Sequence, residues 1–134
     1  MRIGNAFVAA LLRSPLHWVL SGAMDVARYR GRRSGREHSI PTQYVELGDD
    51  VLILVGRPET KQWWRNFRED REVDVLVRGT WRPMIGRAVV GAEEPAALAA
   101  LLDVYLARFP KAARTLGDEE SRVDHAVMVR CRPR

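Results

Sequence analysis

The residues best suited to chemistry lie in one short turn, where cations and a hydroxyl group gather between two glycines. Residues 31–35 have the sequence Gly-Arg-Arg-Ser-Gly, and Arg36 follows directly. Glycine adopts positive φ without a steric penalty, and such turns can direct successive backbone N–H groups into an anion-binding concavity. Because arginine side chains and a serine hydroxyl suit phosphate groups, the turn predicts a phosphate site.

A second stretch adds flat aromatic surface. The loop at residues 56–61 carries Arg57 and Lys61, and a predicted helix follows that contains the adjacent residues Trp63 and Trp64. Between the two stretches, an extended run is interrupted by Pro41, which has no N–H to donate and so marks an edge, a bulge or a docking site. A ligand that joins a phosphate to a flat ring would contact both stretches.

The chain shows no set of side chains that would carry out a reaction on its own. There is no nucleophile elbow, Walker lysine or Rossmann glycine pattern, and adjacent carboxylates such as Glu69 and Asp70 are typical of solvated loops. The single cysteine, Cys131, and three widely spaced histidines predict no metal site and no internal disulfide. This pattern favours an enzyme whose cofactor performs the chemistry.

Composition indicates one globular domain that spans residues 1–134. The apolar fraction is 46%, the charged fraction is 29%, and the net charge of +5 with a pI near 10.1 favours anionic partners. The apolar run near the N-terminus is interrupted by Arg13, Pro15 and His17, so it does not predict a membrane span. We expect a cytoplasmic protein.

The periodicity of apolar residues predicts an α+β fold, a small barrel of about six mostly antiparallel strands with inserted helices. Residues 1–22 are expected to form an N-terminal helical segment that packs on the barrel, covers the pocket or touches a membrane surface. Pro83 and Gly86 suggest an edge or bulge. The predicted strands cover residues 23–29, 38–47, 51–55, 73–78, 81–90 and 125–131, with helices at 62–68 and 96–109 and a polar loop at 117–122.

The order of glycine turn, proline, strand and Trp-x-x-Asn helix resembles the deazaflavin (F420)-dependent nitroreductase family of the flavin/deazaflavin oxidoreductase superfamily. The resemblance covers roughly residues 11–116. It implies a split β-barrel and reduced coenzyme F420, an 8-hydroxy-5-deazaflavin with a phosphate and a polyglutamate tail. It further implies hydride transfer to a quinone, a conjugated alkene or a nitro compound. Some relatives use flavin mononucleotide (FMN), which is the alternative cofactor.

The resemblance also assigns residues to the cofactor. The turn would hold the phosphate or tail carboxylates, a segment of the next strand would lie beside the ring, and cations of the later loop would reach the phosphate or tail. His38 stands where relatives often keep a cation. The positions matched are Arg32, Arg33, Ser34, Gly35, His38, Ser39, Ile40, Pro41, Arg57, Lys61, Trp63 and Asn66.

The acceptor side departs from some relatives, which carry tyrosines in the C-terminal helical region. Phe109, Ala112 and Ala113 occupy that zone here, which suggests a more apolar acceptor. Solvent, Tyr44 or Tyr105 could supply the proton that follows the hydride, and the sequence does not choose among them.

Three other interpretations remain open. An FMN-dependent oxidoreductase would share the phosphate site. A nucleic-acid-binding module is suggested by the cluster of arginines between residues 28 and 36, and a protein could also carry the cofactor without turnover. Edge strands would allow a homodimer.

Overall fold

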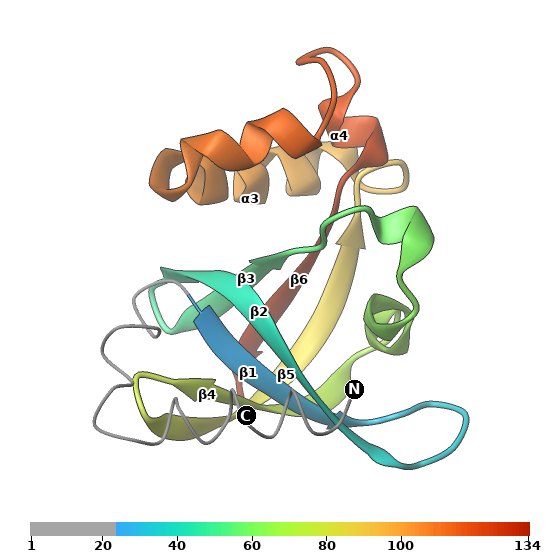
Figure 1. The fold of residues 1–134 in the computed structure, drawn as a ribbon, viewed down its shortest axis with the longest axis vertical. Coiled ribbons are helices and arrows are strands. Elements are labelled where there is room, and N and C mark those ends of the chain that lie inside the picture. The colour runs from blue at the N-terminus through green and yellow to red at the C-terminus, as the bar shows by residue number, and fades with distance from the viewer. Residues whose placement is uncertain (1–23) are drawn as a thin grey trace.

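The computed structural model describes residues 24–134, and its centre is a closed antiparallel barrel with the strand order β1-β2-β3-β6-β5-β4 (Figure 1). The strands are β1 (Met24–Arg30), β2 (Glu37–Leu47), β3 (Asp50–Leu54), β4 (Arg71–Val77), β5 (Thr80–Val90) and β6 (Val127–Pro133). The predicted six-stranded barrel with inserted helices is confirmed. The N-terminal helical segment, with its predicted roles at the pocket or a membrane, lies outside the described residues.

Alternation along the strands separates the barrel interior from its outer surface. On β1, Ala27 and Tyr29 enter the barrel core, and their register partners on β2 are Ile40, which packs against the core, and the exposed His38. On β3, Val51 and Ile53 enter the barrel core, whereas Leu52 packs outward. Both faces of β3 are therefore buried, which explains its uninterrupted apolar sequence.

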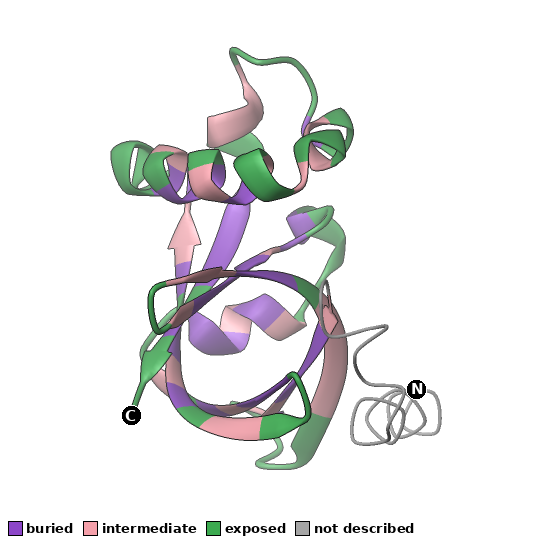
Figure 2. Ribbon diagram, turned by 90° about the vertical axis from the view of Figure 1, so that its left-hand side faces the viewer, coloured by how far each residue is buried: buried purple, intermediate pink, exposed green. Residues whose placement is uncertain are grey.

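A helical layer covers one side of the barrel (Figures 1 and 2). Its main helix, α3 (Pro95–Arg108), buries Leu98, Leu101, Leu102 and Tyr105, which recur at helical spacing. A 3₁₀ helix, η3 (Pro110–Thr115), and the short helix α4 (Arg122–His125) complete the layer. Within residues 24–134, no helix has both the length and the apolar character that crossing a bilayer requires.

The connection into β6 differs from the prediction. The sequence favoured a polar loop at residues 117–122 and a strand from His125, but the chain forms α4 first and β6 begins at Val127. Gly91 explains the tight fit here, because a Cβ at that position would lie 1.7 Å from the Val123 carbonyl oxygen. The backbone of this connection therefore packs directly on the end of β5.

Two 3₁₀ helices, η1 (Pro58–Thr60) and η2 (Trp63–Phe67), join β3 to β4. Phe67 enters the barrel core. A Cβ on Gly86 would lie 2.8 Å from Phe67 Cδ1, so only glycine leaves room for this ring.

The edge or bulge predicted at Gly86 is wrong, because β5 is paired on both sides there. Pro83 pairs in register with β4 only and lies just past the Met84–Pro133 end of the β5–β6 ladder, so the edge predicted at Pro83 is confirmed. Gly86 lies opposite Arg71 and Cys131, and the Pro83 carbonyl accepts a 3.1 Å hydrogen bond from the Arg134 N–H. The glycine serves packing and does not interrupt the strand.

The edge predicted at Pro41 is confirmed. Residues 37–43 of β2 pair with β1, but β3 pairs only with residues 44–47. Pro41 therefore lies where β2 has a partner strand on one side only, so its missing N–H leaves the β2–β3 ladder intact.

Candidate functional site

The basic turn, residues 31–36, connects β1 to β2 and is closed by its own hydrogen bonds. The Gly31 N–H donates to the Arg36 carbonyl at 2.8 Å, and the Gly35 N–H donates to the Gly31 carbonyl at 3.0 Å. Gly35 has a φ of 68°, and the Arg36 N–H donates to Ser34 Oγ at 3.2 Å. These bonds fix the backbone while the side chains of residues 32–34 stay exposed.

A cleft of about 550 Å³ separates the basic turn from η2 and the loop before it. Ligand pockets typically have volumes of a few hundred to a thousand Å³. The structure brings together predicted residues from three separate stretches of sequence. The cleft is lined by Tyr29, Gly31, Arg32, Arg33, Ser34, His38, Gln62, Trp63, Arg65 and Asn66.

Aromatic rings form one wall of this cleft. The Tyr29 ring lies 5.6 Å from the His38 ring and 5.3 Å from the Phe67 ring, and Trp63 packs edge-on against Phe67 at 6.2 Å. Burial raises the pKa of Tyr29, and the charge of Arg32 partly opposes this shift. The wall presents flat surface and a neutral phenol to a bound ring.

Cations beside this wall have no acidic partners within residues 24–134. The guanidinium groups of Arg32 and Arg33 make no ion pair or hydrogen bond with a described residue. Arg65 also lines the cleft, and its buried Nε has no hydrogen-bond partner there. A buried donor without an acceptor is costly, which concerns Arg65 Nε alone. The exposed, unpaired guanidinium groups of Arg32 and Arg33 fit a ligand that supplies anionic oxygen atoms.

Asn66 lines the cleft, and both polar atoms of its side chain form hydrogen bonds within the protein. Its Oδ1 accepts a 2.7 Å hydrogen bond from the Arg32 N–H, and its Nδ2 donates to the Trp63 carbonyl at 2.8 Å. The residue is only 8% exposed. The sequence predicted a cofactor contact, and the structure shows a link between the two walls.

The remaining predicted cofactor residues lie outside the cleft lining. Ser39, Ile40 and Pro41 continue β2 beyond His38, and Ile40 packs against the barrel core. Arg57 and Lys61 flank η1 as exposed cations, and Gly35 closes the basic turn. The Arg57 backbone is left-handed, with a φ of 50°.

Neither predicted proton donor lines the cleft. Tyr105 lies on the buried face of α3, where its hydroxyl donates to Gln43 Oε1 at 3.0 Å and burial raises its pKa to about 12. Tyr44 lies inside the barrel, where burial and then the charge of Glu46 raise its pKa. Phe109 and Ala112 pack within the helical layer, also away from the cleft.

Sequence reasoning missed four cleft residues: Tyr29, Gly31, Gln62 and Arg65. Tyr29 could have been found from strand alternation, because it lies opposite His38 in register. Gly31 packs closely on His38, since a Cβ there would lie 3.0 Å from His38 Nε2. Gln62 and Arg65 flank the tryptophans in sequence. Whether their side chains point into the cleft depends on the 3₁₀ geometry of η2, which the sequence pattern did not reveal.

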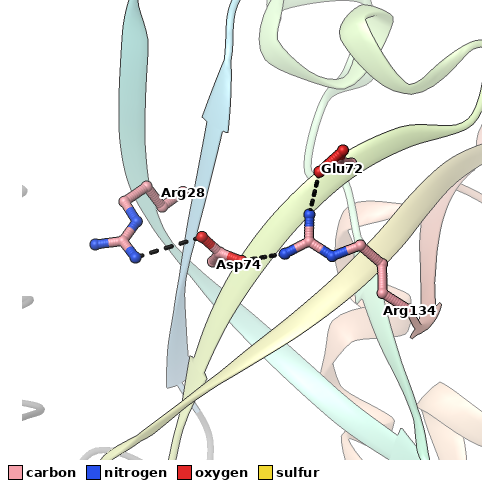
Figure 3. A network of polar contacts seen from close by, with 4 residues as sticks. All are labelled: Arg28, Glu72, Asp74 and Arg134. Atoms are coloured by element: carbon pink, nitrogen blue, oxygen red, sulfur yellow. Dashed lines mark hydrogen bonds and ion pairs between the residues drawn. The ribbon is translucent and has the colours of Figure 1, made fainter.

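A second cleft of about 640 Å³ adjoins the first, and Tyr29 lines both. Its walls carry the ion-pair network, which consists of Arg28, Glu72, Asp74 and Arg134 (Figure 3). Asp74 accepts from Arg28 at 3.3 Å and from Arg134 at 2.7 Å, and Arg134 also pairs with Glu72. These arginines are already neutralised by acids.

Comparison with known proteins identifies relatives of this arrangement. Residues 21–129 match the family described as F420H(2)-dependent quinone reductase. A Mycobacterium tuberculosis protein (strain ATCC 25618 / H37Rv) named "Putative F420H(2)-dependent quinone reductase Rv3178" is 27% identical over 97 residues, which cover 70% of this chain and 71% of that protein.

Two solved structures share the fold. One, titled "Structure of F420-H2 Dependent Reductase (FDR-A)", has a TM-score of 0.60 and 18% identity, and the match covers 80% of this chain and 92% of that one. Another, titled "domain-swapped dimer", has a TM-score of 0.62 and 16% identity, with 96% and 93% covered. These matches confirm the split-barrel fold.

The family match extends over most of the chain, including the basic turn, η2 and the strands that hold them. The cleft supplies what a phosphate-bearing deazaflavin needs, namely unpaired arginines beside an aromatic wall. The chain therefore belongs to the F420H(2)-dependent quinone reductase family, and it is an F420H2-dependent reductase.

Proposed function

We propose that the cleft between the basic turn and η2 binds reduced F420 and that the acceptor is a quinone. One observation carries this proposal: Arg32 and Arg33, which have no acidic partner among residues 24–134, share a cleft with Trp63 and Tyr29. Phosphate and ring recognition are thereby combined in one place. Arginine forks suit phosphate, and aromatic faces suit a flat heterocycle.

Each part of the cleft has a separate task in this proposal. Arg32, Arg33 and Ser34 bind the phosphate or the tail carboxylates, and the Arg65 side chain adds a positive charge to the cleft lining. Arg57 and Lys61, which lie on the adjoining loop, attract the anionic tail from outside the cleft. The reduced deazaflavin supplies the hydride when it is bound.

The protein contributes position and shielding. The rings of Trp63 and Tyr29 limit the orientations of the flat cofactor ring. Correct orientation of two reactants lowers the activation barrier by several kcal/mol. The Phe67 ring behind them excludes water from the barrel interior. Because Tyr44 and Tyr105 lie away from the cleft lining, we propose solvent as the source of the proton.

The choice of a quinone is supported by the description of the matching family, which names quinones rather than nitro compounds or enones. The second cleft is lined mainly by charged side chains, which suit an apolar quinone poorly. We therefore place the acceptor on the exposed face of the ring in the first cleft. Initial rates with a quinone, an enone and a nitroarene at equal concentration test the preference, and a faster nitroarene would overturn it.

The cofactor assignment is tested by titrating the purified protein with F420 and with FMN, following cofactor and tryptophan fluorescence. We expect tighter binding of F420, and about tenfold weaker binding in Trp63→Ala, since base–aromatic stacking contributes roughly 1–3 kcal/mol. Preference for FMN would keep the barrel and change the cofactor. Binding of neither would contradict the proposal, and binding of generic DNA or RNA that falls steeply with salt would then favour the nucleic-acid interpretation.

The assembly and location of the protein remain predictions. One structural neighbour is titled "domain-swapped dimer", which supports a homodimer as the state to test. Light scattering after size-exclusion chromatography would show the mass of a dimer or of a monomer. Cytoplasmic location is the expectation, and vesicle co-sedimentation of the full chain tests whether it also contacts membranes.

A further inference from the structure

We infer that Asn66 is a positioning residue, which strengthens cofactor binding by holding the basic turn against η2 rather than by contacting the cofactor. This inference rests on the proposed function of the cleft. It assigns a task to the one buried amide among the residues that line the cleft. It also separates Asn66 from the exposed arginines and the aromatic wall, which meet the ligand directly.

The hydrogen bonds of Asn66 reach three separate segments. Its Oδ1 accepts from the Arg32 N–H at 2.7 Å, its Nδ2 donates to the Trp63 carbonyl at 2.8 Å, and its backbone carbonyl accepts from Arg71 Nε at 2.9 Å. These contacts tie together the basic turn, η2 and the first residue of β4. The two sides of the cleft therefore share one buried residue.

The chemistry requires an amide at this position. An asparagine side chain presents an acceptor and a donor at once, whereas aspartate lacks the donor and alanine lacks both. The bond from the Arg32 N–H to its Oδ1 holds the turn backbone at the point from which the Arg32 side chain extends. A turn that is ordered before binding avoids part of the entropy cost of ordering it around the phosphate.

Asn66 is itself firmly held, so it can impose its position on the turn. The next residue, Phe67, is 1% exposed and fills the space beside Gly86 inside the barrel. The turn's own hydrogen bonds set its local shape but do not attach it to the core, and residues 32–36 are all exposed. Asn66 thus connects an exposed turn, a kind of segment that is usually mobile, to the packed core.

The test compares two ligands that differ only beyond the ring system. One is F420, and the other is its riboflavin-like chromophore, an 8-hydroxy-5-deazaflavin without phosphate and tail. If Asn66 acts through the basic turn, Asn66→Ala weakens F420 binding about tenfold, consistent with the loss of a typical hydrogen bond. Binding of the phosphate-free chromophore changes less than about twofold, a margin well below that of one such bond.

Two further readouts distinguish positioning from general destabilisation. The KM for F420H2 should rise in Asn66→Ala while kcat at saturating cofactor stays near the wild-type value. In a background that already lacks both turn arginines, Arg32→Ala/Arg33→Ala, the Asn66→Ala effect should disappear, because coupled residues are non-additive. Thr115→Val is the matched control, since it removes a 2.9 Å side-chain bond to the Ala112 carbonyl far from the cleft.

Several results would overturn the inference. Equal weakening of both ligands would show that Asn66 contacts the ring, and unchanged binding of F420 would show that the link is unimportant. If Asn66→Ala does not fold, Asn66→Ser retains a hydroxyl too short to bridge both partners, and the same comparison applies. Failure of the wild-type protein to bind F420 would instead reject the proposed function, and the inference with it.

Discussion

Two clefts meet at Tyr29, and they use arginine in opposite ways. In the first, Arg32 and Arg33 extend from the basic turn without an acidic partner among residues 24–134. In the second, every arginine of the ion-pair network contacts a carboxylate (Figure 3). The first cleft is lined by three arginines and no acid, whereas the second is lined by four arginines and four acids. The potential is therefore more positive in the first cleft, which favours an anionic ligand there.

The origin of this difference is the position of the acids. Glu72 and Asp74 are two residues apart on β4, so both side chains point to its outward face. β4 pairs with β1 on one side and with β5 on the other. Arg28 on β1 and Arg134, which follows β6, therefore lie within ion-pair distance of these carboxylates. The basic turn projects beyond the paired parts of β1 and β2, and within residues 24–134 no acid forms an ion pair with Arg32 or Arg33 there. Net charge alone would not have separated the two places.

The largest expected effect concerns a third arrangement, a buried carboxyl group that forms no ion pair with a described residue. Asp25 is fully buried, Thr42 Oγ1 donates to its Oδ1, and its Oδ2 has no hydrogen-bond partner among the described residues. Burial raises the pKa of Asp25 to about 7. Stability from this raised pKa is complete below about pH 4 and is lost as pH rises through 7, because the unfolded chain releases the proton first.

Replacing Asp25 removes this dependence. An asparagine side chain has nearly the same shape as that of aspartate and carries no charge, so Asp25→Asn keeps an acceptor for Thr42. The variant should be more stable than wild type by about 4 kcal/mol at pH 8, with little difference at pH 4. Urea unfolding at both pH values measures the change. Parallel pH profiles for the two proteins would show that Asp25 is not the group that titrates.

The next effect tests the unpaired arginines directly. Arg32→Ala/Arg33→Ala should weaken F420 binding about 100-fold, because each charge-assisted hydrogen bond contributes roughly 1.5–3 kcal/mol. Stability should hardly change, since both side chains are exposed. The matched control is Arg134→Ala, which removes a paired cation and should leave F420 affinity unchanged. A similar loss in both variants would remove the distinction between the clefts.

The smallest effect converts the second cleft toward the first. Asp74→Ala removes the acid that Arg28 and Arg134 share, and it should lower the free energy of unfolding by less than about 1 kcal/mol because the pairs are partly exposed. Arg28 then loses its acidic partner, while Arg134 stays paired with Glu72, and the two arginines should bind pyrophosphate weakly at low salt. Calorimetry in the Arg32→Ala/Arg33→Ala background measures pyrophosphate binding to the second cleft alone. If Asp74→Ala gives no gain in binding, ion pairing is not what prevents the second cleft from binding anions.

Local sequence signals predicted most of the frame around the cleft. The strand pattern and the helix of residues 96–109 follow from periodicity, and the basic turn follows from its two glycines. Its placement beside Trp63 came from a family resemblance. These features depend on neighbours in sequence or on a shared pattern.

Other features depended on partners far along the chain. The tasks of Gly86 and Asn66 are set by Phe67 packing and by the Arg32 N–H, which sequence spacing does not reveal. The ion-pair network joins residues from β1, β4 and the end of β6. Burial of Asp25 likewise follows from barrel closure, because its charge alone predicts an exposed side chain.

The space beside Gly86 that holds the Phe67 ring also has a consequence for the order in which the strands pair during folding. Gly86 faces Arg71 on β4 and Cys131 on β6, so the space that receives the ring is enclosed only when the latest strand in sequence has joined the earlier ones. Such long-range pairing is slow compared with local hairpin formation. During synthesis, a chain that still lacks β6 would carry the arginines without a fixed wall opposite them. The cofactor would thus bind only after β6 has paired with its neighbours. It would therefore bind and stabilise fully folded chains but not chains that are still being synthesised.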